Sequence, residues 1–125
     1  MAAVLDRELA TTGDPIADFA WSMGYWADPG DECTWLTDSP TVVDVFARRA
    51  EMIDTYRART GFDLSDHPFY EAFSWWKQAC VVEGVYARRL RGSHAGMAPA
   101  RSVSAIAERV DSMLDRAHAL ITAVS

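Results

Sequence analysis

The sequence predicts a mainly α-helical protein, with one short N-terminal strand followed by about four helices in a single domain that spans residues 1–125. Apolar residues recur at helical spacing in four stretches, and the turn-forming residues gather between these stretches. Half of the 125 residues are apolar. A chain of this size and composition can bury one core.

The first elements are a strand and a helix joined by an acidic turn. Residues 2–5 form a short apolar run that ends in Asp6, as expected of a strand that delivers a carboxylate at its end. Strand alternation would place Asp6 and Glu8 on the same side. Asp14 can cap the helix that follows, with Pro15 at its first position, and the apolar stripe of this helix continues to about residue 25.

A long loop is expected over residues 26–43, where turn formers are dense. Its two tryptophans, Trp26 and Trp35, indicate that the loop packs on the body of the protein. A second helix is predicted over 44–60, with Gly61 ending it.

The third helix is predicted to start near residue 66, to accept Pro68 in its first turn and to end before Gly92. It carries Phe69, Phe73 and Trp76 at helical spacing, and we expect it to be the longest and most buried element. After a loop over 92–99, the last amphipathic helix is predicted over 100–124.

Charge and composition exclude several classes of function. The formal net charge of −6 leaves no general basic field for nucleic acid or for an anionic membrane. Charges interrupt every apolar stretch before bilayer-spanning length, and the first residues lack the pattern of a secretion signal, so a soluble cytoplasmic protein is expected. Cys33 and Cys80 are expected to be separate, reduced thiols.

Several isolated side chains have both a structural and a functional interpretation. The three histidines, His67, His94 and His118, do not sit at metal-ligand spacing, and surface or capping roles are favoured over catalysis. Trp75 and Trp76 point about a hundred degrees apart on a helix, so one should be core and the other semi-exposed, although Trp76 could line a substrate pocket.

Glu83 lies in an otherwise apolar stretch of the third predicted helix. A buried lone carboxylate there would need a partner, such as Lys77 or an arginine from a neighbouring helix. The functional alternative is that Glu83 contacts the polar end of a substrate.

The N-terminal segment is the most specific motif. It reads Leu-Asp-x-Glu and then Gly-Asp-Pro-x-x-Asp-Phe-Ala over residues 5–20. This string resembles the segment that follows the catalytic loop in the aminoglycoside phosphotransferase and choline kinase superfamily, and most of all the bacterial group similar to the kinase-like domain associated with acyl-CoA dehydrogenases. Further likeness, including Tyr25-Trp26, 49–61 and 83–88, extends to about Arg91.

The resemblance implies roles for four acidic residues. Asp6 matches the family's metal-binding Asp, and Glu8 would be an auxiliary metal group, which together imply Mg²⁺ with ATP in full-length relatives. Asp14 matches the turn residue that caps the next helix, and Asp18 matches a residue that supports the site from below. The resemblance implies that the acceptor is a small hydroxyl compound, with an acyl or hydroxy-acid substrate as plausible as an aminoglycoside. In this superfamily, helices after the metal Asp build the acceptor site.

Two departures from the family pattern limit the expected activity. Arg7 stands where this group usually has Trp, and no His-Gly-Asp followed by Asn, glycine-rich strand pair or strand Lys precedes the segment. The chain alone is therefore expected to be inactive and not to bind ATP productively. A complementary N-terminal lobe or a second copy in a homodimer is the expected partner, and the alternative function is a non-catalytic helical dimerisation or partner-binding module.

Overall fold

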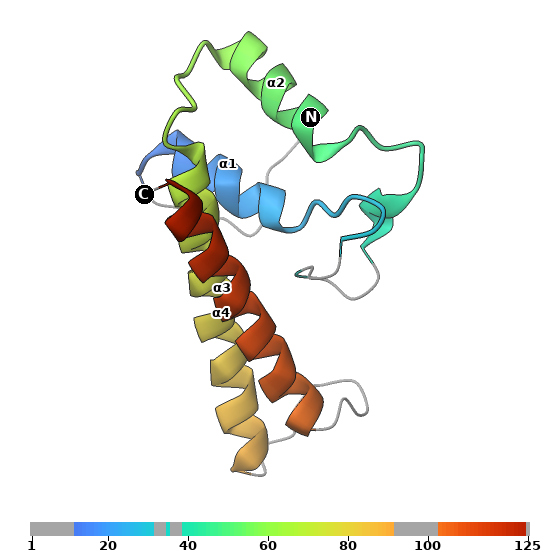
Figure 1. Ribbon diagram of the computed structural model, residues 1–125, viewed down its shortest axis with the longest axis vertical. Helices are drawn as coiled ribbons and strands as arrows, with labels where there is room; N and C mark the ends of the chain where they lie inside the picture. The colour runs from blue at the N-terminus through green and yellow to red at the C-terminus, as the bar shows by residue number, and fades with distance from the viewer. Residues whose placement is uncertain (1–11, 32–34, 36–38, 92–102, 125) are drawn as a thin grey trace.

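The computed structural model describes residues 12–31, 35, 39–91 and 103–124 and is helical, as predicted (Figure 1). Its elements in chain order are α1 (Pro15–Gly24), the 3-10 helix η1 (Pro40–Val42), α2 (Arg49–Thr60), α3 (His67–Leu90) and α4 (Val103–Val124). The predicted strand over 2–5 lies outside the described residues. In the described part, no helix combines the length and hydropathy that crossing a bilayer requires.

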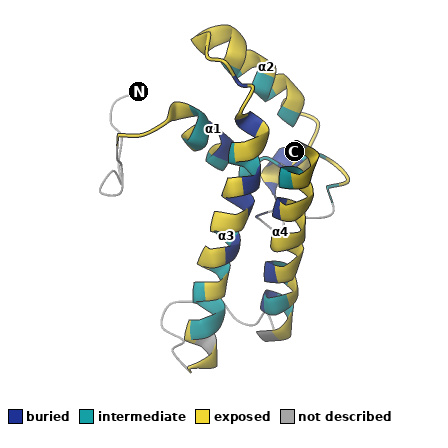
Figure 2. Ribbon diagram, turned by 60° about the vertical axis from the view of Figure 1, so that its left-hand side comes forward, coloured by how far each residue is buried: buried dark blue, intermediate teal, exposed yellow. Residues whose placement is uncertain are grey.

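The two long helices, α3 and α4, run antiparallel and form most of the body, and α1 packs across α3 near its N-terminal end (Figure 1). The buried side chains lie where α3 and α4 face each other, while the outer faces are exposed (Figure 2). The main core comprises Trp35, Trp75, Ala79, Val110, Met113 and Ala117. Trp35 therefore anchors the long loop to the body, as its aromatic character predicts.

A second, smaller core joins α1 to α2 and to the turn before α3. Phe19, Met23 and Leu64 form its centre. Tyr56 of α2 stacks on Phe19 with ring centroids 3.9 Å apart. Helix α2 contributes no buried residue of its own, so it is held mainly by this one-sided contact.

Apart from two helix starts, the predicted helix ends are confirmed to within one or two residues. Helix α2 starts later than predicted, and residue 100, where the last helix was predicted to start, lies outside the described residues. Gly61 ends α2 in the left-handed conformation, with φ of 71°, and its N–H donates to the Arg57 carbonyl at 2.9 Å. The helix begins at Arg49 and not at residue 44, because the chain first turns at residues 44–46. The Glu51 carboxylate then accepts from the Arg48 N–H at 2.8 Å and starts the helix there.

The buried stripe of α3 is displaced by one position from the expected one. Ala72, Trp75 and Ala79 are buried against α4, whereas Phe69 and Phe73 are nearly half exposed. The predicted division of the tryptophan pair is confirmed, since Trp75 is 3% exposed and Trp76 is 50% exposed. Phe69, Phe73 and Trp76, which were noted at helical spacing, form a second apolar stripe that is left partly exposed on the same helix.

Candidate functional site

Asp14 anchors the start of α1 to the long helix α3. One carboxylate oxygen accepts from the Ile16 N–H at 2.8 Å and caps α1, with Pro15 as the first helical residue, which confirms the predicted cap. The other oxygen accepts from the Tyr70 hydroxyl at 2.7 Å. These bonds lower the pKa of the Asp14 carboxyl, the Tyr70 bond most of all, and the pKa of Tyr70 is raised in turn. The turn that follows the acidic segment is thus fixed to the body.

The structure describes only one of the other three acidic residues of the motif. Asp18 lies in the first turn of α1 and is exposed; its backbone N–H donates to the Asp14 carbonyl at 3.3 Å, and its own carbonyl accepts from the Ser22 hydroxyl at 3.0 Å. Asp6 and Glu8 lie outside the described residues. Among the residues that are described, no three His, Cys, Asp or Glu side chains gather as a metal site.

An apolar groove of about 350 Å³ lies between the first half of α3 and the second half of α4. Ala72 and Ala117 are its buried members, and Trp76 is one of the exposed side chains along it. The complete lining is Phe69, Ala72, Phe73, Trp76, Leu114, Ala117, His118 and Ile121. Trp76, a candidate substrate-binding residue, is therefore in a cavity of ligand-binding size.

Glu83 does not share this groove. Its side chain is exposed, so the expected burial is wrong and the expected pairing is not required. Within the described part of the chain, the side chain of Glu83 forms no hydrogen bond or ion pair. Lys77, its expected partner, has its ammonium group 4.4 Å from the centre of the Trp21 ring. The apolar neighbours of Glu83 in sequence misled the prediction, since α3 is exposed on one side at this level.

His67, the first residue of α3, is buried, which contradicts the surface role expected for it. The centre of its ring lies 5.6 Å from the centre of the Phe19 ring, and its Nε2 atom has no hydrogen-bond partner among the described residues. Burial lowers the pKa of His67, and the positive charges of Arg49 and Arg57 act in the same direction, against the opposing effect of Glu71. His118 is exposed as expected, and His94 lies outside the described residues.

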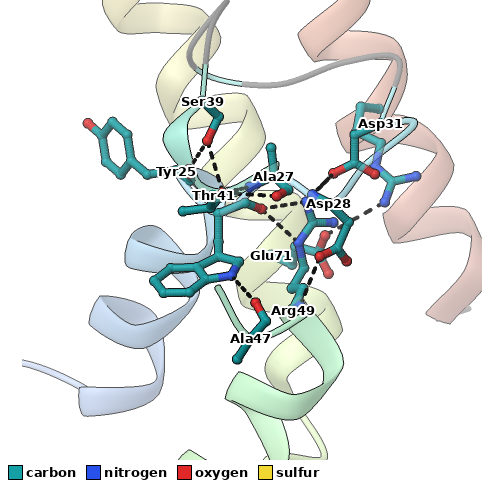
Figure 3. Close-up of polar contacts among 11 residues, drawn as sticks. Tyr25, Ala27, Asp28, Asp31, Ser39, Thr41, Ala47, Arg49 and Glu71 are labelled. Carbon is teal, nitrogen blue, oxygen red and sulfur yellow. Dashed lines mark hydrogen bonds and ion pairs between the residues drawn. The ribbon is translucent and has the colours of Figure 1, made fainter. Parts of the chain in front are cut away.

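A polar network holds the long loop against the start of α2 (Figure 3). The Arg49 guanidinium donates to the Trp26 carbonyl at 2.6 and 3.0 Å and pairs with Asp31 at 2.6 Å. Asp28 accepts from the Arg49 N–H at 3.1 Å, and Thr41 bonds both backbone groups of Ala27. Every polar group at the centre of the network is paired within the protein, so its role is structural.

Sequence reasoning missed two features, the hydrogen bond between Asp14 and Tyr70 and the groove between α3 and α4. The Asp14–Tyr70 bond joins residues 56 positions apart, and no local pattern signals it. The groove had a signal, because Phe69, Phe73 and Trp76 repeat at helical spacing beside the stripe of Ala72, Trp75 and Ala79. Two apolar stripes on one helix indicate more apolar surface than one partner helix covers.

Comparison with known proteins finds similarity to acyl-CoA dehydrogenase family members. The chain is 35% identical over 100 residues to acyl-CoA dehydrogenase family member 10 of Mus musculus, and the match covers 72% of the chain. It is 32% identical over 103 residues to family member 11 of Rattus norvegicus, and 31% identical over 107 residues to that of Gallus gallus. No protein-family model and no solved structure matches.

The match is to one segment of much longer proteins. The chain spans 9% of the length of the mouse protein and 12% of the rat and chicken proteins. The matched proteins bear the acyl-CoA dehydrogenase name, and the motif of residues 5–20 resembles the kinase-like domain associated with such enzymes. The comparisons therefore show that this chain is similar to one segment of acyl-CoA dehydrogenase family members 10 and 11.

Proposed function

We propose that this chain is part of a kinase-like phosphotransferase and supplies the metal carboxylate Asp6, the neighbouring Glu8 and helices of the acceptor side. Two independent observations support the proposal: the Leu-Asp-x-Glu and Gly-Asp-Pro string, and the similarity to segments of acyl-CoA dehydrogenase family members 10 and 11. Phosphoryl transfer depends on positioned charge, so the segment that bears such carboxylates must be held rigidly.

The Asp14 anchor is the observation that carries the proposal. The turn after the acidic segment is fixed twice, by the cap on Ile16 and by the hydroxyl of Tyr70. Supporting contacts from a rigid helix are what a metal carboxylate needs to keep its geometry. In this proposal Asp14 and Asp18 support the segment, and Asp6 with Glu8 holds Mg²⁺ against the phosphates of ATP.

The acceptor in this proposal is a small hydroxyl compound, which receives the terminal phosphoryl group of ATP. Trp76 is the proposed contact for it, and the position of this side chain on the groove between α3 and α4 supports that role. Glu83 is a weaker candidate, since it is exposed and is not among the groove residues. The catalytic base and the phosphate cradle would come from a complementary lobe.

The proposal is tested with Mn²⁺ as a paramagnetic substitute for Mg²⁺. The chain is mixed with the polypeptide that precedes the homologous segment in mouse family member 10, and binding of Mn²⁺ with ATP is followed by electron paramagnetic resonance. We expect Asp6→Asn to weaken this binding by about tenfold or more, because one direct ligand is lost. Asp111→Asn, at an exposed position of α4 outside the motif, is the matched control and should leave it within about twofold. Equal binding by wild type and Asp6→Asn would overturn the assignment.

A second candidate function is a helical module that binds a partner or dimerises without catalysis. The open apolar groove favours it, because Phe69, Phe73 and Trp76 are each 46–50% exposed along one helix face. The DNA upstream of the codon for Met1 separates the two candidates. An encoded His-Gly-Asp with Asn a few residues later supports the enzyme, and upstream DNA without kinase-like sequence supports the module.

A further inference from the structure

The groove between α3 and α4 has the shape of a helix-docking surface. Phe69 and Trp76 are seven residues apart, as are Leu114 and Ile121 on the antiparallel helix. Seven residues of α-helix rise about 10.5 Å, or two turns. A third helix laid along the groove would therefore present apolar residues at positions i, i+3 or i+4, and i+7, which is the usual spacing of helix-in-groove recognition.

The ends of the groove are acidic. Asp66 precedes Phe69 by three residues, and Asp111 precedes Leu114 by three residues, so each lies one turn from a groove residue. Asp115 stands three residues before His118. All three aspartates are exposed.

The nearby cations of α3 and α4 are engaged elsewhere. Lys77 lies over the ring of Trp21, and Arg116 pairs with Glu71 at 3.8 Å. His118 is the one basic residue in the groove lining. In the described part of the chain none of the three aspartates is in an ion pair, and the chain as a whole carries a formal charge of −6.

This charge pattern decides between two occupants. A second copy of the chain would bring the same aspartates and the same formal charge of −6 to this surface, and like charges oppose association. A helix with lysine or arginine beside its apolar stripe would instead meet opposite charges at both ends of the groove.

We infer that the groove binds a basic amphipathic helix of another protein. Three apolar side chains of this helix occupy the space beside Phe69, Phe73, Trp76 and Leu114, over Ala72 and Ala117. Its lysines and arginines pair with Asp66, Asp111 and Asp115. The inference deepens the partner-binding candidate above and rests on it.

The test uses three fluorescein-labelled synthetic peptides of about five helical turns. The first carries leucine at i, i+3, i+4 and i+7 and lysine elsewhere, the second has glutamate in place of lysine, and the third has the composition of the first in shuffled order. Binding to the full chain is measured by fluorescence anisotropy at low and high salt. We expect the lysine peptide to bind at least about tenfold more tightly than either other peptide, with the difference from the glutamate peptide shrinking as salt rises.

Variants of the chain locate the binding surface. Trp76→Ala and Leu114→Ala should each weaken binding of the lysine peptide about tenfold, because both remove groove contacts. The double change Asp111→Asn and Asp115→Asn should weaken binding of the lysine peptide and not binding of the glutamate peptide. Val81→Ala is the matched control, since Val81 is 52% exposed and is outside the groove lining. Circular dichroism checks that each variant is folded.

Three results would overturn the inference. They are equal affinity for the lysine and glutamate peptides, unchanged binding by folded Trp76→Ala and Leu114→Ala, or a dimer in light scattering that Trp76→Ala dissociates. The last result would identify a second copy as the occupant and leave the partner-binding candidate standing. None of these measurements uses metal or ATP, so they are independent of the Asp6 experiment.

Discussion

Gly24, the last residue of α1, lies against the indole of Trp35. A β-carbon at this position would be 2.3 Å from two ring atoms, Cε2 and Cζ2. The ring is 3% exposed and packs edge-on against Trp75 at 5.8 Å, so it has no free space into which to move. We therefore expect Gly24→Ala to lower the free energy of unfolding by about 1–3 kcal/mol, as overpacking typically does, measured by urea denaturation.

Gly84 is the matched control for this effect, because it is also a helical glycine. A β-carbon there would meet only Arg88 Nη1, at 3.7 Å. Gly84→Ala should therefore raise the free energy of unfolding by about 0.5–1 kcal/mol, since alanine loses less conformational entropy in a helix. If both variants were destabilised equally, the Trp35 contact would not be the cause.

His67 makes the stability of the protein depend on pH. Its folded pKa lies below the value of 6.5 in the unfolded chain, because burial disfavours the imidazolium. As the pH falls, the unfolded state therefore takes up a proton on His67 before the folded state does. The contribution of His67 to the free energy of unfolding is complete above pH 6.5 and is lost as the pH falls through the folded pKa. We expect the free energy of unfolding to fall from pH 7.5 to 5, and to fall less in His67→Gln, as followed by urea denaturation at each pH. His118→Gln, at an exposed position, should keep the wild-type slope.

Arg49 determines where α2 begins, because its guanidinium joins the helix to the loop at Trp26 and Asp31. The side chain is only 18% exposed, and lysine cannot reproduce its two parallel bonds to one carbonyl. Arg49→Lys should therefore lower the free energy of unfolding by about 1.5–3 kcal/mol. Urea denaturation followed by tryptophan fluorescence measures this. The exposed Arg59 in the same helix is the control, and Arg59→Lys should be neutral; equal stability of Arg49→Lys and wild type would show that the network contributes little.

The elements differ in how far the sequence alone could predict them. Asp14, Pro15 and Gly61 are local signals, and the helix ends that they mark are found where they were predicted. The start of α2 was predicted too early because it depends on contacts over long separations, such as the bond from Trp26 Nε1 to the Ala47 carbonyl at 2.8 Å. A local pattern does not contain this information.

The candidate site shows the same division. Helical spacing predicted that Trp75 and Trp76 differ in exposure, but which apolar stripe of α3 becomes core is decided by Trp35 and by Val110 and Met113 of α4. These partners are distant in sequence, so the two apolar stripes signal extra apolar surface, but the sequence does not tell which stripe is left open as the groove. The roles of Asp6 and Glu8 stay predictions, because these residues lie outside the described part.

The arrangement of two unequal cores predicts that the protein opens in parts. Helix α2 has no buried residue and packs against Phe19 through the stacked ring of Tyr56, whereas Met113 at the centre of α4 is fully buried. Helices with few buried contacts open at lower free energy, so amides of α2 should exchange with deuterium faster than those of α3 and α4. Tyr56→Ala removes the stacked pair and should speed exchange in α2 by about tenfold without changing α4, because a loss of about 1.4 kcal/mol is a factor of ten. Thr55→Ala, on the exposed side of α2, is the control, and equal acceleration of α2 and α4 by Tyr56→Ala would mean that the two cores unfold as one unit.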